Sequence, residues 1–398
     1  MPLICQAQDF KQYFTEATLR IDYVFSGNVD HQEISVDELH IMPRWWGKRQ
    51  RLSEVPVRGN GQVIMRSHRT GEVIYRNSFS TLFQEWLSYD EAKTTCRSFQ
   101  NVFLTPMPKD TADITIELYD NRLQTMATLT HMVVPTDILI RHTGYEHVMP
   151  YETLQQAADT TRCIHIAYVA EGYQEQEMGT FLHDAHEAME ALFAHEPFKS
   201  LRDRFHIIAV KSPSADSGTS IPRQGIWRHT ILQSHFDTFY SDRYLTTLHL
   251  KRLHDLLAGT PYEHIIILVN TEHYGGGGIY NSYNLSYTGG KNFLPVVVHE
   301  FGHSFGGLGD EYAYGNDDPM YFSDTEPWEP NLTTQATAFI KWEHLIKEGK
   351  ASLIEGGGYL EKGVWRGCEN CRMRTNEEPE FCVVCQEALV RLIDFYTR

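Results

Sequence analysis

The sequence predicts an α+β protein of two domains, a β-sandwich-like domain followed by a domain that mixes strands and helices. Its 398 residues exceed the roughly 100–200 that one domain usually holds. Up to about residue 145, short stretches alternate apolar and polar side chains, as half-buried strands do. After about residue 150, apolar strand-like segments are joined by a helical pattern. We therefore expect the two domains at residues 9–148 and 149–398.

The β-rich character of the first domain rests on three stretches. Residues 18–25 alternate and end at a Ser-Gly turn signal. Residues 63–65 and 73–75 flank a Gly-containing turn, which predicts a hairpin. Residues 114–118 alternate again. Nothing in this part gathers residues that carry chemistry.

The second domain begins with a strand–helix–strand pattern. Residues 163–170 and 205–210 are apolar strands, and residues 175–195 between them have helical spacing. Strands joined in this way are expected to be parallel. Residues 265–269 form a third apolar strand, and the four glycines at 275–278 follow it. We interpret the glycines as a strand or loop beside a cleft, because no Lys-Ser/Thr pair follows them as in a phosphate-binding loop.

The charge balance excludes several classes of protein. There are 35 Lys and Arg residues against 52 Asp and Glu residues, a formal net charge of −17. Nucleic acids and anionic lipid surfaces need a basic face, so neither is an expected partner. No apolar run approaches the roughly 20 residues that cross a bilayer. The oligomeric state is open, with a monomer favoured.

The segment His299-Glu300-Phe301-Gly302-His303 carries the chemistry. In a helix, residues four apart lie on one face, so His299 and His303 can bind one metal ion. Two imidazoles and one further ligand are a typical catalytic zinc site, with a position left open for water. Zinc lowers the pKa of that water, and Glu300, beside the histidines, is the expected general base.

The third ligand is expected shortly after this helix. Gly306 can end the helix and reverse the chain. The next acidic side chains are Asp310 and Glu311, and either can return to the metal. Four tyrosines are candidates for stabilising an oxyanion: Tyr280, Tyr283, Tyr287 and Tyr312. The pair Asp317-Asp318 is either a calcium site or an exposed acidic turn.

The run from His299 to Tyr312, HEFGHSFGGLGDEY, resembles the active-site segment of the IgA-peptidase-type zinc metallopeptidases, a secreted bacterial family of the zincin group. Residues 170–173 (AEGY) and 381–385 (FCVVC) are similar to other parts of that family. The resemblance implies a zincin-type α/β catalytic domain with a mixed sheet and an active-site helix. It also implies a β-rich N-terminal domain and a zinc endopeptidase that cleaves proteins or glycoproteins.

The sequence departs from the metzincin pattern in one place. The third ligand of metzincins falls ten residues after the first histidine, where this chain has Gly309. Asp310 is one residue later, so Asp310 is favoured and Glu311 remains an alternative. Metzincins also place a methionine turn beneath the metal. Met373 is the candidate here, and an ordinary core methionine is the alternative.

Four cysteines form a second pattern, Cys368-x-x-Cys371 and Cys382-x-x-Cys385. The spacing is typical of a structural zinc site, so the expected cofactors are one catalytic Zn²⁺ and, in this interpretation, a second structural one. An oxidising compartment would favour disulfides instead, and free buried thiols are a third interpretation. In either cross-linked form the cluster would join the loop of Met373 to a C-terminal helix at 386–396.

Residues 1–8 resemble the end of an export signal, which predicts a secreted, periplasmic or cell-surface protein. The leading functional hypothesis is thus a secreted zinc endopeptidase. One alternative is a surface-binding protein with a vestigial metal site, which would have no need of Glu300 as a base. The other is a zinc amidase that acts on cell-wall peptides.

Overall fold

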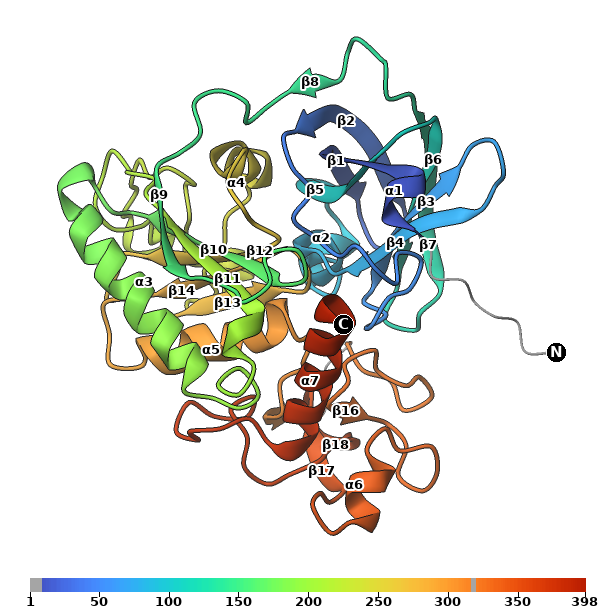
Figure 1. Ribbon diagram of the computed structural model, residues 1–398. Helices are drawn as coiled ribbons and strands as arrows, with labels where there is room; N and C mark the ends of the chain where they lie inside the picture. Colours follow the sequence, from blue (N-terminus) through green and yellow to red (C-terminus); the bar gives the residue numbers. More distant parts are fainter. Residues whose placement is uncertain (1–8, 316–319) are drawn as a thin grey trace.

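The computed structural model describes residues 9–315 and 320–398 (Figure 1). The predictions made for residues 1–8 and for Asp317-Asp318 lie outside these ranges. Over these ranges the chain forms two β-sheets in the N-terminal part, a larger sheet in the middle and a small sheet near the C-terminus. The architecture is therefore mixed α+β, as expected.

The N-terminal part contains two four-stranded sheets, ordered β5-β1-β2-β8 and β4-β3-β6-β7. The strands of the first are β1 (Phe14–Gly27), β2 (Gln32–Met42), β5 (Arg97–Pro108) and β8 (Arg141–His142). Those of the second are β3 (Gly61–Ser67), β4 (Val73–Phe79), β6 (Ala112–Tyr119) and β7 (Thr125–Val133). The short helix α1 (Phe10–Tyr13) precedes β1, and α2 (Leu82–Trp86) and η1 (Asp90–Lys93) lie between β4 and β5.

The predicted strands of this part are confirmed. β3 and β4 form the expected antiparallel hairpin. In β6 every second residue is fully buried, which is the alternation seen in the sequence. Side chains from the two sheets share one core, where the rings of Phe79 in β4 and Phe103 in β5 lie 4.3 Å apart.

The central sheet has six strands in the order β13-β14-β12-β10-β11-β9. These are β9 (Tyr151–Gln155), β10 (Ile164–Glu171), β11 (Phe205–Val210), β12 (His264–Val269), β13 (Gly276–Ile279) and β14 (Tyr283–Tyr287). β10 and β11 are parallel, as predicted, and β12 and β14 continue the parallel set. The two edge strands, β9 and β13, are antiparallel to their neighbours. The glycine run is thus an edge strand.

Helices cover both faces of this sheet (Figure 1). They are α3 (Met178–Phe193), α4 (Leu250–Leu257), α5 (Phe293–Ser304) and α7 (Val383–Thr397), with η2 (Glu175–Glu177), η3 (Arg202–Arg204), η4 (Pro222–Gln224) and η5 (Thr238–Tyr240) in the connections. Alternate residues of β10 enter different cores. Ile166 and Tyr168 pack with α3, α5 and α7, whereas Ala167 and Val169 pack with α4 and the N-terminal sheets. The N-terminal part is therefore joined to the sheet face opposite α5.

A small fourth sheet lies between α5 and α7 in the chain. It comprises β15 (Ala313–Gly315), β16 (Leu332–Thr333), β17 (Ile354–Gly357) and β18 (Tyr359–Arg366), with α6 (Glu343–Lys347) beside it. After this sheet, α7 brings the chain back to the central sheet. Near the end of α7, the ring centre of Phe395 lies 5.1 Å from Nζ of Lys48 in the N-terminal part. The C-terminus therefore ends against the first domain.

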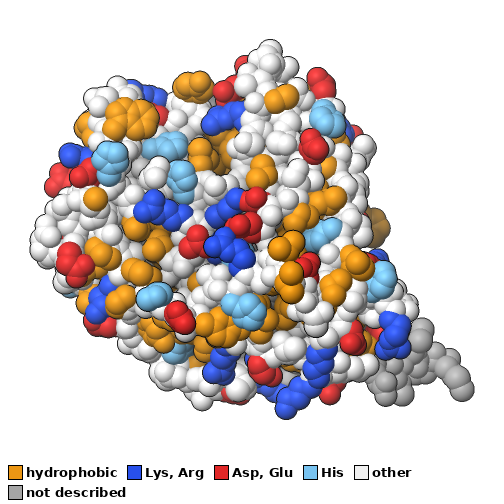
Figure 2. Space-filling view, turned by 90° about the horizontal axis from the view of Figure 1, so that it is seen from above, with side chains coloured by type: hydrophobic (Ala, Val, Ile, Leu, Met, Phe, Trp, Pro, Cys, Tyr) orange, Lys and Arg blue, Asp and Glu red, His pale blue; other side chains and the backbone are white. Residues whose placement is uncertain are grey.

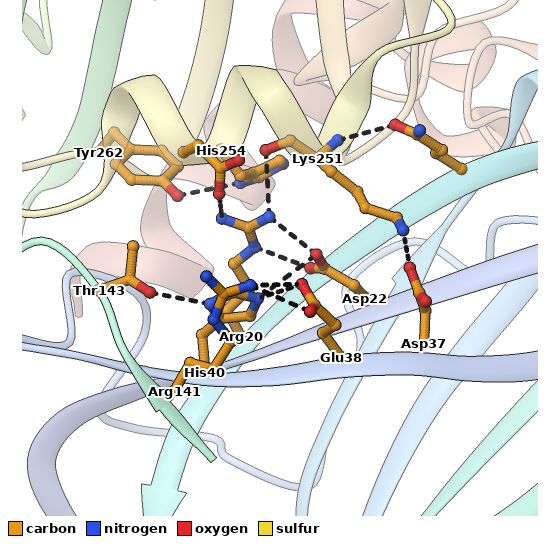
Figure 3. Close-up of polar contacts among 12 residues, drawn as sticks. Arg20, Asp22, Asp37, Glu38, His40, Arg141, Thr143, Lys251, His254 and Tyr262 are labelled. Carbon is orange, nitrogen blue, oxygen red and sulfur yellow. Dashed lines mark hydrogen bonds and ion pairs between the residues drawn. The ribbon is translucent and has the colours of Figure 1, made fainter. Parts of the chain in front are cut away.

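A buried ion cluster also joins the two parts (Figure 3). Arg20 of β1 is 1% exposed and makes a two-pronged ion pair with Asp22, at 2.7 and 2.8 Å. Its remaining N–H groups reach α4, at Asp255 Oδ1 (2.6 Å) and the Lys251 carbonyl (3.1 Å). A guanidinium in this position ties the sheet of β1 to α4, the helix that covers one face of the central sheet.

Charged side chains are interspersed on the visible surface. On the face shown in Figure 2, Lys and Arg lie among Asp, Glu and apolar side chains and are not gathered into one large patch. None of the helices in the described ranges is long and apolar enough to cross a membrane.

Candidate active site

Helix α5 holds the HExxH segment with one face in the core. Val297, Phe301 and Phe305 are almost completely buried, and the rings of Phe301 and Phe305 stack 5.0 Å apart. Pro295 lies in the first turn, where a missing N–H is tolerated. With the apolar face fixed, His299 and His303 point the other way, into a cleft. The predicted orientation of the helix is confirmed.

The chain reverses directly after α5. Gly307, with φ +60°, donates its N–H to the carbonyl of His303 (3.0 Å), and the N–H of Leu308 bonds to the carbonyl of Gly302 (3.1 Å). This is a Schellman-like ending, which favours glycine at the left-handed position. The expectation that Gly306 makes the turn is off by one residue, since Gly307 takes the left-handed conformation. The reversal carries Asp310 back to the histidines.

Three donor atoms converge beside the helix. Nε2 of His299 lies 3.1 Å from Nε2 of His303, and Oδ1 of Asp310 lies 3.1 and 3.2 Å from the two. The Nδ1–H of His299 donates to the carbonyl of Arg372 (3.0 Å), and that of His303 to the carbonyl of Leu308 (2.6 Å). These bonds fix both rings so that Nε2 faces Asp310, the arrangement usual in metal-binding histidines.

Asp310 is held from its other side. The Tyr359 hydroxyl donates to Oδ2 of Asp310 at 2.6 Å. Burial favours the neutral carboxyl, but the imidazoles outweigh it and hold the pKa of Asp310 well below its usual range. Burial likewise lowers the pKa of His303, yet Asp310 outweighs it and raises that pKa to about 9. Asp310 is thus held as a carboxylate anion between the two imidazoles.

Glu300 lies next to the three donors but outside their group. Its carboxylate rests against the edge strand β13, where a Cβ atom on Gly276 would lie 2.7 Å from Oε1 and one on Gly278 would lie 2.6 Å from the Glu300 carbonyl oxygen. The glycines therefore make room for the helix and its carboxylate. Burial, opposed in part by the two imidazoles, raises the pKa of Glu300. The protonated form of this carboxyl group is therefore more favoured than in water.

A cleft of about 1,250 Å³ lies over these residues, and both parts of the chain line it. From the N-terminal part come Ser80, Gln84, Glu85, Ser88 and Tyr89. Ser80 also covers the end of the edge strand, where its N–H donates to the Tyr280 carbonyl (3.0 Å) and its Oγ accepts from the Tyr280 N–H (2.9 Å). The first domain is therefore part of the cleft wall.

Models of known protein families match most of the chain. The model described as IgA Peptidase M64 matches residues 153–354, and the one described as Peptidase M64 N-terminus matches residues 9–130. The chain belongs to the IgA peptidase M64 family. Its two-domain architecture and its activity as a peptidase follow from this membership, which also implies a metal ion. A search of curated proteins gave no match.

Asp310 and Glu311, both candidates for the third ligand, are placed apart in this peptidase. The Glu311 side chain faces away from the histidines, and its Oε1 accepts from Asn331 Nδ2 (2.9 Å) and from the Cys385 thiol (3.1 Å). Burial raises the pKa of Glu311 to about 8. Only Asp310 reaches the imidazoles.

Met373 lies directly beneath the active-site helix. It is fully buried, and a Cβ atom on Gly302 would lie 2.6 Å from its sulfur. Its carbonyl accepts the N–H of Glu311 at 2.9 Å. Met373 therefore touches both the helix and the segment that bears Asp310.

No disulfide joins the six cysteines in the described ranges. Cys371, Cys382 and Cys385 come together with Glu311, whereas Cys368 lies at the side of this group and is less buried. Cys382 caps α7 and Cys385 lies in its first turn. The cluster does adjoin Met373, because the Met373 N–H points to the Cys371 sulfur at 3.4 Å.

Sequence reasoning missed several residues of the site. Tyr359 and Glu85 belong to no local motif, so no signal in the sequence marks them. Of the four tyrosines considered, Tyr280 and Tyr312 line the cleft. The side chains of Tyr280, Tyr283 and Tyr287 are largely buried, and the Tyr283 hydroxyl bonds to the carbonyl of Thr247.

Proposed function

We propose that this peptidase is a secreted zinc endopeptidase in which His299, His303 and Asp310 hold the metal and Glu300 is the general base. The catalytic domain would be of the zincin type and span residues 149–398, with a β-sandwich-like domain at 9–148. The observation that carries the proposal is the convergence of three metal-binding atoms, with a fourth, proton-accepting carboxylate beside them, in a cleft.

The residues fit a zinc ion. Tetrahedral coordination with bonds of about 2.0–2.1 Å places neighbouring donor atoms about 3.3 Å apart. The three separations between Nε2 of His299, Nε2 of His303 and Oδ1 of Asp310 are 3.1, 3.1 and 3.2 Å. Two imidazoles and one carboxylate are also a donor set that zinc sites use for catalysis, with room for water.

The protein residues would share the work of hydrolysis. A bound zinc ion supplies Lewis-acid polarisation and lowers the pKa of a coordinated water. Glu300 takes a proton from water in the cleft and returns it to the amine that leaves. Tyr359 keeps Asp310 oriented through the 2.6 Å hydrogen bond. Burial, which raises the pKa of Glu300, suits a group that must both take and give a proton.

The size of the cleft supports a protein or glycoprotein substrate. Its volume of about 1,250 Å³ exceeds the roughly 300–1,000 Å³ of small-molecule pockets. Side chains of both domains line it, so an extended chain would contact the first domain while its scissile bond lies at α5. Cleavage within a chain requires such a surface on both sides of the bond.

Hydrolysis of casein tests this function. The Glu300→Gln variant should keep its metal and fold but lose activity by several orders of magnitude, because the base is gone while the ligands stay. Glu187→Gln, the same change on the exposed side of α3, is the matched control and should retain full activity. Equal activity of wild type and Glu300→Gln would contradict the assigned base.

Two further results would contradict the endopeptidase assignment. Cleavage of peptidoglycan without cleavage of casein would identify the cell-wall amidase. Metal binding without hydrolysis of either substrate would identify the surface-binding protein with a vestigial site. Detection of the mature protein outside the cytoplasm would support secretion, and its retention inside would contradict it.

A further inference from the structure

A second group of metal-binding side chains lies behind the active site. It consists of Cys371, Cys382, Cys385 and Glu311, whose potential ligand atoms all lie within 4.8 Å of one another. All four residues are buried, with exposures of 0–7%. They come from three separate segments: the turn after α5, the loop after β18 and the start of α7. The fold therefore brings these four residues together, and the spacing of the cysteines alone would not predict that Glu311 joins them.

The separations between these atoms match tetrahedral zinc. With Zn–S of about 2.3 Å and Zn–O of about 2.0–2.2 Å, two sulfurs lie about 3.8 Å apart and a sulfur and an oxygen about 3.5 Å apart. The sulfurs of Cys371 and Cys385 are 3.7 Å apart. Oε1 of Glu311 lies 3.1 Å from the Cys385 sulfur and 3.9 Å from that of Cys382. A disulfide would need sulfurs about 2.05 Å apart.

The backbone around Cys371 favours a thiolate. Its sulfur faces the N–H of Met373 at 3.4 Å and the N–H of Cys382 at 3.3 Å. Hydrogen bonds to the charged form stabilise it. Three thiols and a carboxylate gathered out of water are costly as anions unless a cation neutralises them. Soft sulfur ligands in a tetrahedral arrangement select zinc over calcium or magnesium.

Glu311 is the fourth member of this group, and Cys368 lies at its edge, where its side chain is hydrogen-bonded to that of Cys382. Cys368 is only half-buried and is not among the four whose ligand atoms are mutually close. Glu311 is fully buried, and its Oε1 is further fixed by Asn331, whose Nδ2 donates to it at 2.9 Å. Asn331 also bonds to the backbone N–H and carbonyl of Gly309. The loop that bears Glu311 is thus already shaped to present this carboxylate.

We propose that Cys371, Cys382, Cys385 and Glu311 bind a second Zn²⁺ ion with a structural role. The site would fix the base of the active site, because Glu311 follows Asp310 directly and its N–H is bonded to the Met373 carbonyl. An ion here locks Asp310, Met373 and the start of α7 into one unit. The proposal is independent of the catalytic ion and of the hydrolytic activity.

Zinc analysis of a variant without the first site tests this inference. In full-length His299→Ala/His303→Ala, purified with a reductant and without added chelator, we expect one zinc per chain. Its X-ray absorption spectrum should show three sulfurs at about 2.3 Å and one lighter ligand at about 2.0–2.2 Å. Adding Cys385→Ser should remove this zinc, whereas adding Cys163→Ser, a change at another buried thiol, should not.

Three results would overturn the inference. One is a folded double variant with no zinc that gains none when Zn²⁺ is added. Another is disulfides among Cys371, Cys382 and Cys385 in protein isolated without reductant. The third is a shell of four sulfurs, which would assign the fourth position to Cys368. Wild-type protein that holds this zinc but does not hydrolyse casein would contradict only the proposed catalytic function.

Discussion

The carboxylates of Asp310 and Glu311, consecutive in the chain, belong to two different clusters. Oδ1 of Asp310 lies 3.1 and 3.2 Å from the imidazoles of α5, and Oε1 of Glu311 lies 3.1 Å from the sulfur of Cys385. The backbone after Gly309 directs these two successive side chains to different clusters. The active site and the cysteine group are therefore linked by a single peptide bond of the backbone.

This separation predicts unequal effects at the first site. Loss of a hydrogen-bond partner of a metal ligand lowers metal affinity roughly 10–100-fold. Asp310→Ala removes a proposed ligand itself, so the affinity for zinc at His299 and His303 should fall by more than this. Glu311→Ala should affect that ion less. Competition with a chelator, followed by metal analysis, measures both. Equal weakening in the two variants would contradict the assignment of Asp310.

Tyr359 should influence metal binding without touching the metal. Tyr359→Phe removes the hydroxyl that donates to Oδ2 of Asp310, and we expect metal affinity or activity to fall by about 10–100-fold. The same change at the exposed Tyr240 should have no effect. Titration with Zn²⁺ after chelation checks this, and unchanged affinity in Tyr359→Phe would show that Asp310 needs no such support.

Met373 should contribute to stability through its packing under α5. Met373→Ala leaves a cavity beside Gly302, and buried methionines replaced by alanine lower the free energy of unfolding by about 2–5 kcal/mol. Met132→Ala, at a methionine that is 53% exposed, should change it by less than about 0.5 kcal/mol. Urea denaturation measures both. Equal stability of the two variants would mean that Met373 does not support the helix.

The two carboxylates paired with Arg20 should contribute unequally to the free energy of unfolding. Asp22→Ala leaves a buried guanidinium without its two-pronged partner, which typically lowers the free energy of unfolding by about 3–5 kcal/mol. Asp255→Ala removes a carboxylate that is 57% exposed, and the expected loss is about 0–1 kcal/mol. Thermal unfolding of both variants distinguishes them. A larger loss in Asp255→Ala would show that the contact between domains, and not burial, governs the cluster.

Features with a local period could be predicted from the sequence. The strand of residues 114–118 and the apolar face of α5 each repeat within a few residues, so the pattern alone gives their orientation. The end of α5 was located only to within one residue. Gly306 and Gly307 both suit a helix ending, and the backbone hydrogen bonds to His303 and Gly302 decide that Gly307 turns.

Features that depend on long-range packing could not be predicted. Tyr359 meets Asp310 across 49 residues, and Ser80 meets Tyr280 across 200. No local pattern records such pairs. The position of Glu311 is of the same kind, since the spacing of the cysteines indicates Cys368 and only the fold brings a carboxylate to the other three.

The most direct test is anomalous X-ray diffraction at the zinc absorption edge, from crystals of the wild-type protein grown without added metal. Our account predicts a peak about 2.0–2.2 Å from Nε2 of His299, Nε2 of His303 and a carboxylate oxygen of Asp310, with Glu300 beside it but not bonded to it. An ordered site without such a peak, in protein that hydrolyses casein, would contradict the account.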